Sequence, residues 1–252
     1  MMTKLKSKVA LITGGTSGIG KATAVKMIAE GATVIITGRY QKTVDETVSE
    51  LGVNCRGIVS DASKMEDLLS IGNKVKELTD VVDILFTNAG YGKFAPIEMA
   101  DEKHFDELFN LLVKGTFFTV QQIIPLMKDG SSIILCTSVV TEMGIANFSV
   151  YSGAKSAVQS FVKTFASELL VKKIRVNSVS PGYISTNGFQ KTGLSQEQID
   201  GAIASITPTL PLKRFGNPEE VANTVCFLAS DDSSYTNASE FVVDGGLAVI
   251  KN

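Results

Sequence analysis

A tyrosine and a lysine stand four residues apart in the stretch YSGAK, at Tyr151 and Lys155. On a helix, residues at i and i+4 lie on one face with their Cβ atoms about 5–6 Å apart, so both side chains could act on the same small volume. A phenol can carry a proton and a nearby ammonium stabilises the phenolate, so such a pair is suited to proton transfer. The alternative for an isolated pair is a half-packed tyrosine followed by a solvated lysine, and the rest of the chain has to decide between them.

Other reactive side chains are few. The only histidine, His104, stands in the polar segment DEKHFDEL and is expected to be a solvated helix residue rather than a ligand or a base. The three cysteines, Cys55, Cys136 and Cys226, are far apart and odd in number, without the spacing of metal ligands. We therefore expect no disulfide, no metal site, and a reducing, cytoplasmic location.

Composition and charge argue against several partners. The chain has 252 residues, of which 44% are hydrophobic, and a formal net charge of −2. This charge provides no basic surface for nucleic acid or for an anionic membrane. The sequence also contains no stretch of about 18 apolar residues that could span a bilayer. The length and composition fit one domain, residues 1–252, with its own core.

Short apolar runs alternate with longer amphipathic stretches along the chain. Each run is continuously apolar, as in parallel strands that are covered on both faces. The alternation predicts an α/β fold, a doubly wound parallel sheet of about seven strands with helices on both faces, which binds ligands at the carboxyl ends of its strands. The expected strands are KVALIT, TVIITG, CRGIVSD, VDILFTNAG, SSIILCTS, RVNSVSPG and EFVVDGG, and the expected helices cover 18–30, 41–51, 64–78, 101–127, 150–170 and a stretch that begins at Pro218 after Asn217 as N-cap.

Between residues 183 and 217 this pattern loosens, since glycines and prolines interrupt a single short helical stretch. A loop this long in a compact domain is usually functional or disordered. We expect a mobile flap over the site, with a plain surface excursion as the alternative.

The first expected strand ends in a glycine-rich turn, TGGTSGIG, in which Gly14, Gly18 and Gly20 are spaced as G-x-x-x-G-x-G. Such a turn lets the backbone approach a diphosphate closely and opens a helix whose free N–H groups favour anions. The pattern G-x-G-x-x-G is not met, because Thr23 stands where its third glycine would be. A glycine-rich turn without a ligand is the alternative.

The second expected strand ends in VIITGRY and offers no acid for the adenosine ribose, because Gly38 and Arg39 stand there. With no carboxylate to repel a 2′-phosphate and a guanidinium able to chelate it, NADP(H) is favoured over NAD(H). NAD(H) stays open, since Arg39 could instead stack on the adenine of either cofactor.

Together these motifs resemble the short-chain dehydrogenase/reductase family over nearly the whole chain, and the resemblance implies a single-domain Rossmann fold. The family motifs T-G-x-x-x-G-x-G, N-A-G, the active-site serine, Y-x-x-x-K and P-G-x-I-x-T are matched in order and spacing. The resemblance places the catalytic residues at Ser138, Tyr151 and Lys155, and the cofactor contacts at Gly14, Thr16, Ser17, Gly18, Ile19, Gly20, Arg39, Asp61, Ala62, Asn88, Ala89, Gly90, Tyr151, Lys155, Pro181, Gly182, Ile184 and Thr186.

The resemblance implies hydride transfer between NADP(H) and a ketone or secondary alcohol. Tyr151 would be the general acid/base, Lys155 would stabilise its phenolate and hold the nicotinamide ribose, and Ser138 would hydrogen-bond the carbonyl oxygen. The alternatives are a cofactor-binding regulator without turnover and a related reaction such as epimerisation or dehydration. Family members are commonly homotetramers, with helices 101–127 and 150–170 at one interface and the C-terminal strand at another.

One position departs from the family. The segment LLVKG puts Leu112 where an asparagine usually completes the catalytic set and supports a proton relay to the lysine. Asn110 lies about 200° around a helix from it and cannot substitute. Leu112 keeps the carbonyl group but removes the side-chain amide, so we expect reduced but retained activity. It is also the only support for the regulatory alternative.

The substrate pocket is expected to be lined by the segment 139–150, VVTEMGIANFSV, and by the flap. These residues predict an apolar site with Thr141, Glu142 and Asn147 as candidate polar contacts, or with Glu142 as a solvated loop charge. This composition fits a small-molecule ketone of moderate size.

Overall fold

Seven parallel strands form one sheet in the computed structural model, which describes residues 3–186 and 195–250. Their order is β3-β2-β1-β4-β5-β6-β7, so the direction of winding reverses between β1 and β4. This confirms the predicted doubly wound α/β fold. The strands are β1 (Val9–Ile12), β2 (Thr33–Gly38), β3 (Cys55–Val59), β4 (Val82–Thr87), β5 (Met127–Cys136), β6 (Arg175–Pro181) and β7 (Glu240–Val243).

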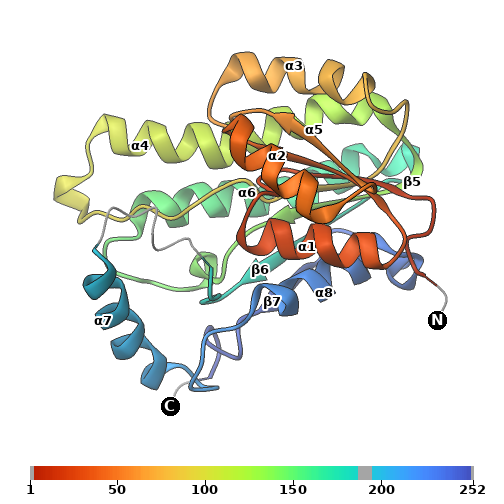
Figure 1. Cartoon of the computed structure of the whole chain (residues 1–252). Coiled ribbons are helices and arrows are strands. Elements are labelled where there is room, and N and C mark those ends of the chain that lie inside the picture. Colours follow the sequence, from red (N-terminus) through yellow and green to blue (C-terminus); the bar gives the residue numbers. More distant parts are fainter. Residues whose placement is uncertain (1–2, 187–194, 251–252) are drawn as a thin grey trace.

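Helices cover both faces of the sheet (Figure 1). Successive strand residues point to opposite faces, so neighbouring residues of β1 enter different cores. Ile12 packs in the same cluster as Met27 and Val225, whereas Leu11 packs in the cluster of Val120 and Val158. The first face carries α1 (Gly18–Ala29), α2 (Gln41–Leu51) and α8 (Pro218–Ala229), and the second carries α3 (Met65–Lys76), α5 (Gly115–Ile123) and α6 (Ser149–Glu168).

The expected helix over 101–127 is interrupted in the structure. α4 (Glu102–Leu108) leads into a π-helical turn, Phe109–Lys114, before α5 begins at Gly115. Any Cβ at Gly115 would lie 2.7 Å from the carbonyl oxygen of Ala62, so the helix approaches the backbone after β3 as closely as glycine allows. This close approach is a tertiary contact, which the periodicity of the segment does not reveal.

The prediction that His104 is solvated was wrong. Its side chain is buried, as is that of Leu108, which lies four residues later on the same face of α4. That face packs toward α6. The backbone N–H of His104 donates to Asp101 Oδ1 at 2.8 Å, which caps the helix.

The segment that was expected to be a flap is anchored at its base. Ile184 forms a parallel bridge with Gly216, and the Gly216 N–H donates to the carbonyl of Tyr183 at 2.9 Å. Within it, α7 (Gln196–Ile206) lies at one edge of the molecule, apart from the sheet (Figure 1). Residues 187–194 of this segment lie outside the described residues, so its mobility stays a prediction.

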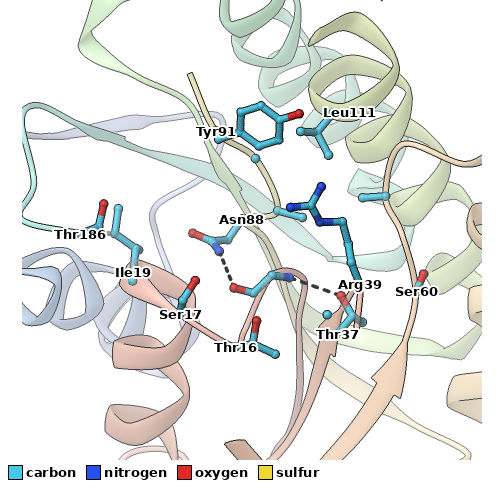
Figure 2. A pocket seen from close by; sticks show the side chains of 16 residues that line it. Thr16, Ser17, Ile19, Thr37, Arg39, Ser60, Asn88, Tyr91, Leu111 and Thr186 are labelled. Carbon is cyan, nitrogen blue, oxygen red and sulfur yellow. Dashed lines mark hydrogen bonds between the residues drawn. The ribbon is translucent and has the colours of Figure 1, made fainter. Parts of the chain in front are cut away.

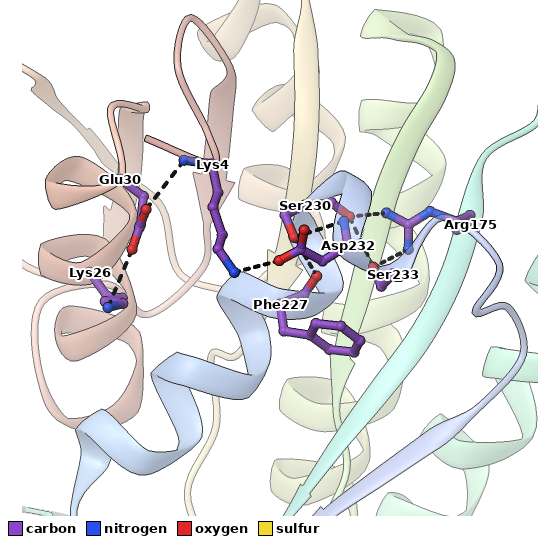
Figure 3. A network of polar contacts seen from close by, with 8 residues as sticks. All are labelled: Lys4, Lys26, Glu30, Arg175, Phe227, Ser230, Asp232 and Ser233. Atoms are coloured by element: carbon purple, nitrogen blue, oxygen red, sulfur yellow. Dashed lines mark hydrogen bonds and ion pairs between the residues drawn. The ribbon is translucent and has the colours of Figure 1, made fainter. Parts of the chain in front are cut away.

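A polar network joins the N-terminal segment to the residues that follow α8 (Figure 3). The Lys4 backbone N–H donates to Glu30 at 3.3 Å, and its ammonium pairs with Asp232 just after α8. From β6, Arg175 donates to the Ser233 hydroxyl at 2.8 Å and to the Ser230 carbonyl at 3.2 Å. The network thus joins the start of the chain, the end of α1, the end of α8 and one strand of the sheet.

Within residues 3–186 and 195–250, none of the helices has the length and apolar character that a bilayer span requires.

Candidate active site

The glycine-rich turn after β1 is held by the strands on either side of it (Figure 2). The Thr13 hydroxyl accepts from the backbone N–H groups of Asn88, at 2.9 Å, and Ala89, at 3.0 Å. The Asn88 amide donates to the Gly14 carbonyl at 3.2 Å, and the Gly14 N–H donates to the Thr37 hydroxyl at 3.3 Å. Side chains after β4 and within β2 therefore fix the turn between them.

Glycine is required at two positions of this turn. Gly14 has φ +65°, and a Cβ there would lie 2.9 Å from the Cα of Ala89. A Cβ at Gly20 would overlap the Gly14 carbonyl, so the start of α1 packs directly on the turn. Ser17 stands at the N-cap of α1 without a side-chain cap, which leaves the first N–H groups of the helix for a ligand. Uncapped N–H groups at a helix N-terminus suit the diphosphate of a dinucleotide.

A pocket opens above this turn between the ends of β1, β2, β3 and β4 (Figure 2). Most of the predicted cofactor contacts line it, and those that do not are Gly20, Asp61, Tyr151, Lys155, Pro181, Gly182 and Ile184. One Asp61 oxygen instead accepts from the N–H and hydroxyl of Ser63, at 3.0 and 2.7 Å. The predicted residues that line the pocket are Gly14, Thr16, Ser17, Gly18, Ile19, Arg39, Ala62, Asn88, Ala89, Gly90 and Thr186, and those that the sequence analysis missed are Thr37, Gly38, Ser60, Tyr91 and Leu111.

Arg39 provides the positive charge of this pocket. Its guanidinium carbon lies 5.5 Å from the ring centroid of Tyr40 and 5.9 Å from that of Tyr91, within the range of cation–π contact. Among the described residues that line the pocket, none carries a carboxylate. The guanidinium therefore meets no competing anion on the pocket wall.

Tyr91 connects the pocket to a charged cluster. Its hydroxyl donates to Glu107 at 2.6 Å, and Lys93 pairs with the other oxygen of Glu107 at 2.6 Å. Burial and this hydrogen bond raise the pKa of Tyr91 to about 12. The hydrogen bonds from Lys93 and Tyr91 hold the pKa of Glu107 below its usual value. Tyr91 directly follows the N-A-G motif, and this position was a signal that could have revealed it.

The predicted catalytic residues come together at the ends of β5 and α6. Tyr151 lies in the first turn of α6, and the buried Lys155 lies one turn later with its Nζ 6.0 Å from the Tyr151 ring centroid. The Lys155 ammonium donates to the Cys136 carbonyl at 2.7 Å. Ser138 follows β5, and its oxygen accepts from the Val140 N–H at 3.5 Å. That contact leaves the hydroxyl proton of Ser138 available to a substrate.

Ser138 and Tyr151 line one cavity of about 360 Å³. Thr186 lines both this cavity and the pocket above the glycine turn, so the two spaces meet there. Gly182 and Ile184 also line the catalytic cavity, whereas Pro181 and Lys155 line neither space. Part of the predicted wall is present: Val139, Val140, Ile145 and Phe148 come from the segment 139–150, and Tyr183 and Ile206 from the segment 183–217.

The candidate polar contacts in the segment 139–150 lie elsewhere. Thr141, Glu142 and Asn147 do not line the catalytic cavity. The Thr141 hydroxyl donates back to the Ser138 carbonyl at 2.9 Å, and Glu142 accepts from Gln159 at 3.4 Å. The cavity wall is therefore less polar than the sequence suggested.

Leu112 lies in the π-helical turn and is buried against Leu108 and Ala154. Its side chain also reaches Gly90, where a Cβ would lie 2.6 Å from Leu112 Cδ2. The irregular turn is thus present with a leucine at this position. The effect of Leu112 on a proton relay stays a prediction.

Within 3–186 and 195–250, His, Cys, Asp and Glu side chains form no group of three that could hold a metal ion.

A parallel sheet with an uncapped helix start at a glycine turn, beside a cavity lined by Ser138 and Tyr151, defines a nucleotide-binding α/β oxidoreductase. A family model described as "Enoyl-(Acyl carrier protein) reductase" matches residues 14–248. Oxidoreductase asL5 of Sarocladium schorii is 39% identical over 249 residues, which cover 98% of each chain.

Solved structures agree with this classification. A structure described as a short chain dehydrogenase/reductase family protein aligns with TM-score 0.85 at 33% identity, over 98% of this chain and 100% of its own. L-Sorbose reductase from Gluconobacter frateurii, complexed with NADPH and L-sorbose, aligns with TM-score 0.90 at 30% identity, over 99% of this chain and 100% of its own. The chain belongs to the short-chain dehydrogenase/reductase family, whose members use NAD(H) or NADP(H).

Proposed function

We propose that the protein is an NADP(H)-dependent reductase of ketones, or in reverse a dehydrogenase of secondary alcohols. The observation that carries this proposal is the shared cavity of Ser138 and Tyr151, which meets the dinucleotide pocket at Thr186. A carbonyl group in the cavity would lie between two hydroxyl donors and next to the place of the nicotinamide. The bound cofactor supplies the hydride.

The protein's own residues handle the proton and the developing charge. Tyr151 gives its proton to the carbonyl oxygen, and Ser138 donates a hydrogen bond to the same oxygen as negative charge develops there. Lys155, buried and beside the Tyr151 ring, stabilises the phenolate that remains and binds the nicotinamide ribose. In alcohol oxidation each of these steps runs backwards.

NADP(H) is the proposed cofactor because of Arg39. The guanidinium lies in the dinucleotide pocket with no acidic side chain among the described residues of the wall, so it can pair with a 2′-phosphate. The related L-sorbose reductase was solved with NADPH, which supports the same choice. The predicted cofactor contacts at Gly20, Asp61, Pro181 and Lys155 remain part of the proposal, although these residues line neither the dinucleotide pocket nor the catalytic cavity.

The proposed assembly is a homotetramer in the cytoplasm. β7 is the last strand of the described sheet, with Val242 half exposed, and Phe105 on α4 is also exposed, which provides apolar surface at both expected interfaces. The three cysteines are free and buried, in keeping with a reducing compartment. A cofactor-binding regulator without turnover is the second candidate, and Leu112 is the observation in its favour.

One experiment separates the two candidates. Oxidation of NADPH and of NADH by the purified protein is followed against a panel of ketones and diketones, with Tyr151→Phe alongside. We expect an NADPH-dependent rate that the Tyr151→Phe variant loses while it still binds NADPH. NADPH binding without any rate in the unmodified protein would contradict the proposal and favour the regulator.

A further inference from the structure

Aromatic rings from separate segments surround the reacting hydroxyl groups. Phe94 comes from the loop after β4, Phe148 immediately precedes α6, Tyr151 lies in the first turn of that helix, and Tyr183 follows β6. Burial raises the pKa of Tyr183, which keeps it neutral. The rest of the wall is mostly aliphatic, and within 3–186 and 195–250 no charged side chain lines the cavity.

Two of these rings form a flat stack beside the catalytic tyrosine. The centroids of Phe94 and Phe148 lie 3.9 Å apart with an angle of 19° between the ring planes. Both rings stand nearly perpendicular to Tyr151, at centroid distances of 5.6 Å for Phe94 and 6.3 Å for Phe148. A group attached to the carbonyl carbon would therefore meet aromatic surface next to the reacting oxygen.

The backbone around the stack is arranged to hold it. The Ala95 N–H donates to the Asn147 carbonyl at 3.0 Å, which ties the loop of Phe94 to the loop of Phe148. Asn147 has φ +71°, a left-handed turn that places the next residue, Phe148, at the start of α6. A Cβ at Gly92 would overlap the Phe94 ring, so the glycine makes room for the ring in this position.

Such a wall discriminates between ketones by desolvation and by ring contact. Hydroxyl groups of a polyhydroxy ketone would lose water and find few partners, because Ser138, Tyr151, Tyr183 and Thr186 supply the polar side chains of the described wall. A carboxylate or phosphate would find no cation among the lining residues described. A planar aromatic ring would gain contacts with the rings of the wall.

Given the proposed reductase function, we propose that its substrates are neutral ketones in which an aromatic ring system is joined to the carbonyl carbon directly or through one carbon atom, or the corresponding alcohols. The carbonyl oxygen lies at Ser138 and Tyr151, and the ring system lies against Phe94 and Phe148. The described part of the wall, within 3–186 and 195–250, disfavours hydroxylated and anionic ketones.

The test compares ketones of matched shape with NADPH. We expect 2-tetralone, which contains a fused benzene ring, to have a kcat/KM about five- to tenfold above that of its saturated analogue 2-decalone. Dihydroxyacetone and phenylpyruvate, which carry hydroxyl groups and a carboxylate, should fall about 100-fold or more below 2-tetralone. Equal or higher values for 2-decalone, dihydroxyacetone or phenylpyruvate would overturn the inference.

Variants localise the effect to the ring stack. Phe94→Leu removes one ring, and Gly92→Ala displaces that ring while keeping it in the protein. Both should lower kcat/KM for 2-tetralone by about five- to tenfold more than they lower that for 2-butanone, which has no ring to contact the stack. Tyr235→Leu, at a fully exposed aromatic residue that lines neither pocket, is the matched control and should change neither. A loss shared equally by both ketones, or by the control, would contradict the role of the stack.

Binding is measured separately from turnover. Calorimetric titration of 2-tetralone into the protein with NADP⁺ should give a dissociation constant that Phe94→Leu weakens by about five- to tenfold. If the ketone binds in this way but NADPH is never oxidised, the proposed reductase function fails and the assignment of the cavity stands. If 2-tetralone does not bind while another ketone is reduced, the assignment fails and the reductase function stands.

Discussion

The ammonium of Lys155 lies 2.7 Å from the carbonyl oxygen of Cys136, two residues before Ser138. This hydrogen bond joins the helix that carries the catalytic tyrosine to the strand that carries the serine. Because the ammonium is buried, it is fixed relative to both side chains.

Lys155→Met should therefore lower kcat for ketone reduction by about 100-fold, since it removes the cation beside the Tyr151 ring together with the bond to β5. Lys163→Met, at an exposed lysine of the same helix, serves as the control and should leave kcat unchanged. Steady-state kinetics with NADPH, with circular dichroism to check the fold, measures the difference. Comparable rates for the two variants would exclude Lys155 from the catalytic chemistry.

Arg39→Ala should lower kcat/KM for NADPH by about 10- to 100-fold and leave that for NADH nearly unchanged, because a charged hydrogen bond to the 2′-phosphate is lost. Arg56→Ala is the matched control, since this arginine of β3 bonds backbone carbonyls and does not line the dinucleotide pocket. Equal losses with NADPH and NADH would instead indicate that Arg39 stacks on the adenine of either cofactor.

Leu112→Asn introduces the side-chain amide that family members usually have at this position. The residue is 2% exposed and packs against Leu108 and Ala154, so an amide there should lower the free energy of unfolding by about 1–3 kcal/mol. We expect kcat to rise nonetheless, whereas Leu112→Ala should lose stability without any gain in kcat. Unchanged turnover of Leu112→Asn across pH would show that the leucine does not impair a proton relay.

The Glu107 carboxylate should make stability depend on pH. Its pKa is lowered from 4.5 in the folded protein by the hydrogen bonds from Lys93 and Tyr91, so the charged form stabilises the fold above that pH. Glu107→Gln should lower Tm at pH 7, and this difference should shrink as the pH falls from 4.5 through the lowered pKa, because the carboxyl group of the unmodified protein then becomes protonated and, like the glutamine amide, uncharged. Thermal unfolding from pH 7 to pH 3 tests this, with the exposed Glu46→Gln as control. A Tm difference that is constant over this range would contradict the assigned linkage.

The N-terminal segment should be held by Leu5 rather than by the neighbouring ion pair. Leu5 is fully buried, and Leu5→Ala should cost about 2–5 kcal/mol in the free energy of unfolding. Lys4→Met removes the exposed pair with Asp232, and such pairs contribute little (Figure 3). Chemical denaturation of the two variants compares them directly, and a larger loss for Lys4→Met would reverse this order.

The sequence predicted the parts of this structure that depend on local pattern. Continuous apolar runs predicted the seven strands, because strands that are buried on both faces are apolar at every position. The amphipathic stretches between these runs predicted the helices. The glycine-rich turn was equally predictable, since the neighbouring backbone lies too close to Gly14 and Gly20 for any side chain there.

The features that escaped prediction depend on contacts between distant segments. The π-helical turn within 101–127 is associated with Gly115 packing on Ala62, and His104 is buried on the face of α4 that packs toward α6. Likewise, the stack of Phe94 and Phe148 joins loops more than 50 residues apart. Contacts between segments that are distant in the sequence leave no local hydrophobic periodicity, so only the folded structure shows them.

The hydrogen bonds between Thr13 and the segment Asn88–Ala89 also impose an order on biosynthesis. Thr13 is made 75 residues before Asn88, and the edge of β1 that faces β4 has no partner until β4 has emerged from the ribosome. A nascent chain that ends before Asn88 contains the whole glycine-rich turn but lacks the Asn88 side chain that hydrogen-bonds to the Gly14 carbonyl. We therefore expect a nascent chain to bind a dinucleotide only after this second segment has been translated.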